Sequence, residues 1–248
     1  MGRERYLLGD DEDTIHANVV ELKTAKEKRK NWWHYHKVYL LAATAIIAMA
    51  VYSVYSITAQ PQPDYSIALL TSFNLPDEIK SAMEEHFSKY ADDRNNDGKA
   101  VVRLNSYVFS NASNYEAFQA DFIRFAGDVE MSTCMIYLYD QASLDMLTES
   151  MSGLFQYNNG EPMPADADDY RNARRSWDSF EGLKSFPLEL EESENGWTHE
   201  KVQELCSRLN VSVRTTTNTA LSKKEDALAY HADSLLLLER LESGEALR

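Results

Sequence analysis

The sequence lacks the short motifs that identify common enzyme classes. It contains no G-x-S-x-G nucleophile turn, no H-E-x-x-H zinc motif, no P-loop and no G-x-G-x-x-G loop. The three histidines that follow residue 64 are His86, His199 and His231, and all three fall on predicted helices beside charged neighbours. We interpret them as solvated side chains and expect a protein that is not an enzyme.

Cysteine is also scarce, with two residues in the whole chain, Cys134 and Cys206. No cysteine precedes the larger part of the chain to carry a lipid anchor, so we expect any membrane attachment to come from the polypeptide itself. An oxidising compartment would permit one disulfide between the two cysteines. Two buried free thiols fit the sequence equally well.

Charge is missing from residues 38–59, which read VYLLAATAIIAMAVYSVYSITA. At 1.5 Å per residue, a helix of this length spans roughly the 30 Å hydrocarbon core of a bilayer. The stretch begins too late and runs too long for a signal peptide, whose apolar region has about 7–15 residues. We therefore predict a single transmembrane helix over 38–59.

Basic residues flank this stretch on one side only. Residues 23–37 contain six of them, whereas the next basic residue after the stretch is Lys80. Lysine and arginine favour the cytoplasmic side of a membrane. The sequence thus predicts a cytoplasmic tail at 1–37, a linker at 60–64 and an extracytoplasmic domain at 65–248, in the cell membrane.

The predicted outer part is strongly acidic. Residues 60–248 hold 33 acidic and 17 basic residues, a net charge of −16, whereas residues 1–37 carry +1. A surface of this charge repels phosphates, so we expect no nucleic acid as a partner. Cations and cationic partners remain compatible with it, as does a simple contribution to solubility.

Apolar patterning after the linker alternates between strand and helix. A short apolar run over 65–71 is typical of a buried strand, and apolar residues spaced three and four apart follow from Pro76 onward. Further strands are predicted over 100–108, 133–139 and 211–216, and further helices over 114–126, 141–151, 198–209 and 223–243. This order predicts an α/β domain with three layers and a mostly parallel sheet.

Residues 153–197 interrupt the alternation. They are rich in Gly, Pro, Asp and Asn, and we predict irregular loops with at most one short helix. Their isolated aromatic residues allow two interpretations: flat rings that line a sugar or peptide site, or loops packed onto the sheet. The aromatic residues concerned are Tyr157, Tyr170, Trp177 and Trp197.

The run from Tyr65 to Ser110, together with MIYLYD at 135–140, resembles the first lobe of bacterial extracellular solute-binding proteins. More closely, it is similar to small membrane-anchored relatives in Gram-positive bacteria. The resemblance covers roughly residues 64–150, with a possible extension to the closing segment 198–242, and implies a periplasmic-binding-protein-like α/β lobe. A complete two-lobed binding protein is much longer, so the resemblance implies one lobe without a second.

One motif is compatible with metal binding. Residues 93–99 read DRNNDGK and match D-x-N-x-D-G, the first half of a calcium loop in which Gly98 permits the sharp turn. The oxygen donors would be the side chains of Asp93, Asn95 and Asp97 and the carbonyl of Lys99. The Glu expected at position 12 is replaced by Leu104, and a strand is predicted to follow. A calcium site and an ordinary polar turn both remain open.

The functional expectation is a membrane-anchored domain that binds a solute or a protein partner. The alternative is a single-pass signalling or assembly component that couples outside binding to the tail at 1–37. A cell-surface hydrolase is a third possibility, and no motif supports it.

Overall fold

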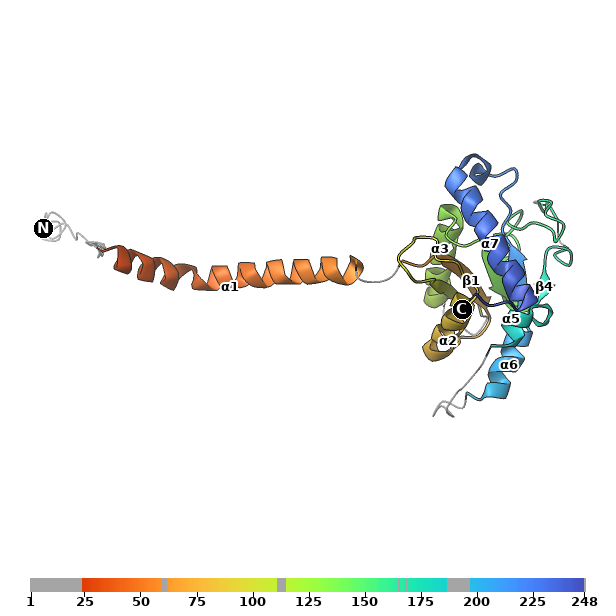
Figure 1. Ribbon diagram of the computed structural model, residues 1–248, viewed down its shortest axis with the longest axis horizontal. Coiled ribbons are helices and arrows are strands. Elements are labelled where there is room, and N and C mark those ends of the chain that lie inside the picture. Colours follow the sequence, from red (N-terminus) through yellow and green to blue (C-terminus); the bar gives the residue numbers. More distant parts are fainter. Residues whose placement is uncertain are drawn as a thin grey trace, which may run out of the picture. The chain divides into compact units, whose positions relative to one another are not determined.

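The computed structural model describes residues 24–58, 62–110, 115–164, 166–167, 169–186 and 197–247 (Figure 1). Backbone contacts divide the chain into two compact units, Met1–Gln60 and Pro61–Arg248. Most of the predicted tail and the first two linker residues lie outside the described residues. The same holds for residues 187–196 of the predicted irregular region.

The described part of the first unit is the helix α1, Ala25–Thr58, which begins well before the uncharged stretch. Thr24 and Glu27 start it with reciprocal bonds, in which each backbone N–H donates to the other side chain at 3.2 and 3.3 Å. Further along, the hydroxyls of Thr44 and Ser53 donate to carbonyls one turn back. Among the described residues, α1 is the one helix long and apolar enough to cross a membrane.

The second unit contains a five-stranded sheet with the order β2-β1-β3-β5-β4. The central strand β1 (Tyr65–Thr71) pairs in parallel with β2 (Val102–Val108) and with β3 (Ile136–Tyr139). The mixed α/β class and the mostly parallel sheet are therefore confirmed.

On the far side of the sheet the pairing is antiparallel, a detail that the prediction of a mostly parallel sheet left open. Strand β5 (Asn210–Val213) runs antiparallel both to β3 and to the two-residue strand β4 (Arg175–Ser176). Two antiparallel strands can be joined without a long crossover connection, unlike two parallel strands. The chain enters β5 from the helix α6 (His199–Ser207), with two residues between them.

Two hydrophobic cores lie on opposite faces of the sheet, because side chains alternate along each strand. The first core takes Ile67 and Leu69 from β1 and packs them against α2 (Asp77–Ser88), α5 (Glu181–Lys184), α6 and α7 (Glu225–Ser243). The second core takes the intervening strand residues and packs them against α3 (Tyr115–Met131), α4 (Gln141–Leu147) and the chain around 151–173.

The outer edge of the sheet at β2 is closed by side chains from the flanking helices. The backbone N–H of Val102 donates to Ser88 Oγ at 2.9 Å, and that of Leu104 donates to Glu84 Oε1 at 2.7 Å. The N–H of Val108 donates to Asp121 Oδ2 at 2.9 Å. Unpaired edge groups invite strand addition by another chain. These three donors are not free for such pairing.

Residues 153–186 hold more regular structure than predicted. Besides β4 and α5, they contain the single-turn 3₁₀ helix η1 (Trp177–Ser179), which Ser176 begins by accepting a bond from the Asp178 N–H. A second 3₁₀ turn, η2 (Ala220–Lys223), precedes α7.

Candidate functional site

The predicted calcium ligands lie together in one exposed turn between α2 and β2. Both carboxylate oxygens of Asp93 accept backbone bonds, from the N–H of Asp97 at 3.1 Å and of Gly98 at 2.8 Å. Asn95 Oδ1 accepts from the same Asp97 N–H at 2.8 Å, so oxygens of these two side chains lie close to each other. Asp97 Oδ1 in turn accepts from the Lys99 N–H at 2.9 Å.

The backbone of this turn has the shape that the motif requires. Gly98 has φ of +90° and Asn96 has φ of +57°, both in the left-handed region that glycine and asparagine tolerate best. A strand follows the turn, as predicted. Each oxygen that accepts one N–H keeps a second lone pair with which it could bind an ion.

The turn is fixed to the rest of the domain by groups that the sequence did not single out. Asp64 is buried, and its carboxylate accepts from the N–H groups of Arg94, Asn95 and Val101 at 2.8 to 3.0 Å. The Arg94 guanidinium pairs with Asp233 at 2.7 Å and lies 4.6 Å from the ring centroid of Tyr230, both on α7. Asp64 lies directly before β1, and nothing in the neighbouring sequence indicates that its carboxylate would bind the turn.

The fit to calcium is partial. The turn offers three oxygen-bearing side chains and one backbone carbonyl. Among the described residues, no three His, Cys, Asp or Glu side chains come together as a metal-binding group. Without the bidentate carboxylate of an EF-hand loop, any bound calcium would need water ligands and would bind more weakly. Calcium at residues 93–99 therefore stays a prediction.

A second candidate location is the carboxyl end of the parallel strands. In open α/β sheets, ligands bind there, at the point where the strand order reverses. Here that point lies between β1 and β3. Asp140, which follows β3, accepts from the N–H and the hydroxyl of Ser72 at 2.7 and 2.6 Å and from the Ser143 N–H at 2.7 Å. Both carboxylate oxygens are thus engaged within the protein.

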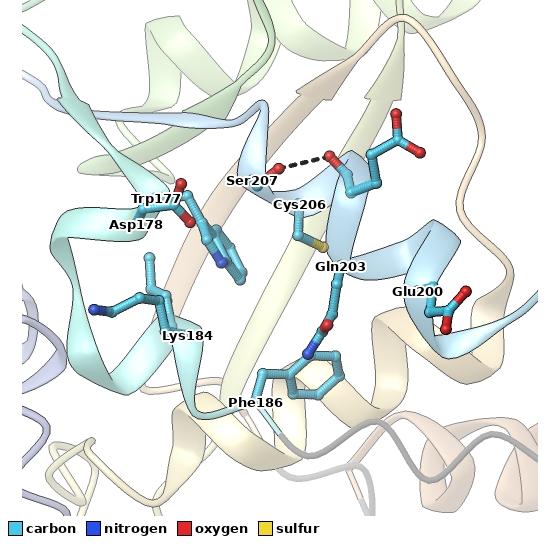
Figure 2. Close-up of a pocket in the computed structure, with 10 residues that line it drawn as sticks. Trp177, Asp178, Lys184, Phe186, Glu200, Gln203, Cys206 and Ser207 are labelled. Carbon is cyan, nitrogen blue, oxygen red and sulfur yellow. Dashed lines mark hydrogen bonds between the residues drawn. The ribbon is translucent and has the colours of Figure 1, made fainter.

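An open cavity of about 430 Å³ lies instead between η1, α5 and α6, and we call it the α6 pocket (Figure 2). Its position follows from local structure. The backbone N–H of Trp177 donates to the Leu209 carbonyl at 2.9 Å, and this bond joins η1 to the end of α6. At the other end of α6, Thr198 caps the helix by accepting from the Lys201 N–H.

The lining of the α6 pocket has an apolar floor and a polar rim. Trp177, Leu183, Phe186 and Cys206 form the floor and are buried, whereas Asp178, Lys184, Glu200, Gln203, Glu204 and Ser207 are exposed. Figure 2 shows the Trp177 ring, the Cys206 thiol, the Gln203 side chain and the Phe186 ring around the opening. The volume lies within the range of small-molecule pockets.

Neither cysteine has the properties of a nucleophile or of a disulfide partner. Both are free and buried, Cys206 in the first core and Cys134 in the second. Burial raises the pKa of each thiol to about 12, so both stay protonated at neutral pH. The structure therefore selects two free thiols from the alternatives that the sequence left open.

The prediction of solvated histidines is wrong for His86. This side chain is buried, and its Nε2–H donates to the Gly182 carbonyl at 2.6 Å, which joins α2 to α5. Nδ1 has no partner among the described residues. Burial lowers the pKa of His86 below its ordinary value, although the bond to Gly182 acts in the opposite direction. His231 is half-buried and donates to the Arg214 carbonyl, while His199 is exposed.

The aromatic residues singled out in the sequence do not form one site. Trp177 lines the α6 pocket, whereas Tyr170 is buried in the second core. Trp197 packs against the first core, with the Lys201 ammonium 4.9 Å from its ring centroid. Tyr157 lies at a separate polar hollow with three asparagines.

We compared the chain with protein families, curated sequences and solved structures. No family model, no curated protein sequence and no solved structure matches the chain.

Proposed function

We propose that this is a single-pass membrane protein whose C-terminal α/β domain lies outside the cell and binds a ligand without chemically changing it. The observation that carries the proposal is the combination of an exposed apolar helix with a separate folded unit that contains an open pocket. Large apolar side chains along α1 remain exposed, for example Ile46 at 69% and Met49 at 71%. A bilayer would cover them.

The distribution of basic residues supports the orientation. The first part of α1 carries Lys26, Lys28, Arg29, Lys30 and Lys37, and the part beyond residue 37 carries no charge. Trp32 and Trp33 lie at the boundary between the two parts, where interfacial aromatic residues are enriched. The tail at 1–37 is then cytoplasmic, and residues 65–248 are extracytoplasmic.

The sheet supports a periplasmic-binding-protein-like lobe. Strand order β2-β1-β3, with both pairs parallel, is the arrangement found in doubly wound α/β sheets. In the proposal, helices on both faces make three layers, and the binding site is the α6 pocket. The resemblance to solute-binding proteins is part of this proposal.

A signalling role is the second candidate, and the continuity of α1 favours it. The helix runs unbroken from Ala25 to Thr58, so its basic part and its apolar part are one rigid segment. A displacement of the apolar part of α1 would therefore also displace its basic part, which belongs to the tail. Deletion of residues 1–23 would leave ligand capture intact but abolish a signal, if the tail transmits one.

The experiment that tests ligand capture places a photoreactive residue at position 203, which lines the α6 pocket, in the full chain expressed in intact cells. We expect irradiation to give a discrete adduct, measured as a mass increase of the purified protein. The control position is Glu239, exposed on α7 and away from the pocket lining. Equal labelling at both positions, or none at either, would contradict a ligand site in this pocket.

A further inference from the structure

We infer that the α6 pocket takes a small organic amine with an apolar body and a hydrogen-bond acceptor. This inference rests on the proposed function, because it names the ligand class of the same pocket. The ligand class is inferred from three independent observations. They are the unpaired carboxylates on the rim, the apolar floor, and the indole N–H of Trp177.

The rim has an excess of uncompensated negative charge. Its cation, Lys184, pairs with Glu181 at 2.7 Å, and the carboxylate of Glu204 pairs with Arg208. The carboxylates of Asp178 and Glu200 form no ion pair within the described part of the chain. Among the described residues that line the pocket, a cation thus meets two unpaired carboxylates and no unpaired ammonium group.

The field of the whole domain acts in the same direction. Residues 60–248 carry a net charge of −16, which raises the local concentration of cations and lowers that of anions. Anionic solutes are therefore disfavoured both by the rim and by the surroundings of the pocket.

The floor requires more than a bare ion. Trp177, Leu183 and Phe186 are buried at 4%, 2% and 6% exposure, so the surface that they present to the pocket is apolar and largely withdrawn from water. An inorganic cation would lose hydration there without compensation. An amine with an apolar body can bury that body on the floor while its ammonium stays at the rim, and it gains attraction to the aromatic rings.

The third observation is the indole N–H of Trp177. The residue as a whole is more than nine-tenths buried, and the hydrogen bonds that Trp177 makes within the described part of the chain come from its backbone. Figure 2 shows the ring turned toward the opening, opposite Gln203. Nε1 is not one of the fully buried polar atoms that lack a partner, so this donor opens onto the pocket. A hydroxyl or carbonyl oxygen on the ligand would accept its bond in place of water, and the Gln203 amide could bind the same group.

The test uses three probes that share a phenol ring and differ in the charge of the side chain: tyramine (cationic), tyrosol (neutral) and 4-hydroxyphenylacetate (anionic). Each is titrated into the full chain in phosphatidylcholine nanodiscs and followed by ligand-detected NMR at low salt. We expect tyramine to bind about five- to tenfold more tightly than tyrosol, since each exposed carboxylate contributes only modestly. The preference should shrink as salt is added.

Two variants separate the contributions. Asp178→Asn combined with Glu200→Gln should bring tyramine to the affinity of tyrosol and leave tyrosol unchanged. Trp177→Phe, which removes the N–H and keeps an aromatic ring, should weaken all three probes by a similar factor. Glu239→Gln is the matched control for lost negative charge and should behave as wild type. Thermal melts check that each variant is folded.

Equal affinity for the three probes, or tightest binding of the anion, would overturn the amine assignment. Absence of binding by all three at millimolar concentration would overturn it as well. These outcomes leave ligand capture by the pocket to be judged separately, because the photoreactive residue at position 203 reports a ligand of any charge.

Discussion

The two cores on opposite faces of the sheet are built from the same strands but filled differently. The first core is lined by aliphatic strand residues such as Ile67, Leu69 and Leu138. The second core holds tyrosines from β2 and β3, and two of them have hydrogen-bonded hydroxyls. Tyr139 bonds Ser212 at 2.7 Å, and Tyr107 donates to Asp128. Polar bonds of this kind fix one arrangement of neighbouring elements.

From this difference we expect the first face to change shape more easily than the second. The second face is held by directional bonds and acts as the scaffold. The first face depends on packing, which is tight where α5 meets α7 and open at the α6 pocket next to it. A ligand in the α6 pocket therefore meets the face with mostly aliphatic strand residues, where the bond from His86 to Gly182 joins α2 to α5.

The largest effect should come from the glycine that allows the close contact on the first face. A Cβ at Gly182 would lie 2.8 Å from the Leu241 backbone oxygen, whereas a Cβ at Gly127 on α3 would meet nothing within 4 Å. Gly182→Ala should therefore lower the free energy of unfolding by about 2–3 kcal/mol through overpacking. Gly127→Ala should raise it by up to ~1 kcal/mol, because alanine favours a helix. Urea unfolding measures both, and equal effects of the two substitutions would contradict the comparison.

The next effect concerns the scaffold. The Asp128 carboxylate accepts bonds from Tyr107, from Thr133 Oγ1 at 3.2 Å and from Asn105 Nδ2 at 3.1 Å. Asp128→Ala leaves these donors without their acceptor, and we expect a loss of about 2–3 kcal/mol in the free energy of unfolding. Glu130→Ala, an exposed position on the same helix, should change it by less than about 0.5 kcal/mol. A loss no larger than that of the control would show that these bonds do not stabilise the second face.

A pH effect should appear on the first face. Burial lowers the pKa of His86, so between its folded and unfolded values the unfolded chain binds more protons. This contribution to stability is complete above the unfolded pKa of about 6.5 and is lost as pH falls through the lowered folded pKa. We expect the melting temperature to fall between pH 7.5 and 5.5.

Substitution separates His86 from other groups that titrate. His86→Gln should reduce this acid-induced fall, whereas His199→Gln, at an exposed position, should leave it unchanged. His231, whose pKa burial also lowers, accounts for the part that remains in His86→Gln. An identical fall in wild type and His86→Gln would contradict the role given to His86.

The smallest effect is the binding of calcium to residues 93–99, outside both cores. If calcium binds only the folded state, then at five times its dissociation constant it raises the free energy of unfolding by about 1 kcal/mol. This corresponds to a rise of roughly 2–4 °C in the melting temperature. The rise should vanish on EDTA and in Asp93→Ala with Asp97→Ala. It should persist in the matched pair Glu130→Ala with Glu149→Ala. The absence of any rise with millimolar calcium in wild type would leave an ordinary turn.

The parts of the fold that were predictable from sequence are those fixed by local pattern. The apolar run of β1 gave its bounds at Tyr65–Thr71, and the spacing of Ile79, Met83 and Phe87 gave the buried side of α2. The turn at 93–99 formed as its motif indicated, because Asx side chains and glycine act within a few residues.

The rest depends on contacts between distant residues. His86 is buried because α5, 96 residues away at Gly182, packs over it. The α6 pocket joins Trp177 to Gln203 across a segment without periodic pattern, so neither the cavity nor its unpaired carboxylates had a sequence signal. Strand β5 shows a strand pattern, but its direction depends on how the preceding helix returns to the sheet.

The measurement that tests the account most directly is protease accessibility of the full chain in intact cells, followed with separate tags at the two ends. We expect added protease to remove the C-terminal tag and digest the domain, while the N-terminal tag and the tail stay protected until the membrane is permeabilised. A C-terminal domain that stays protected in intact cells, or equal exposure of both ends, would contradict a membrane-anchored domain that captures its ligand outside the cell.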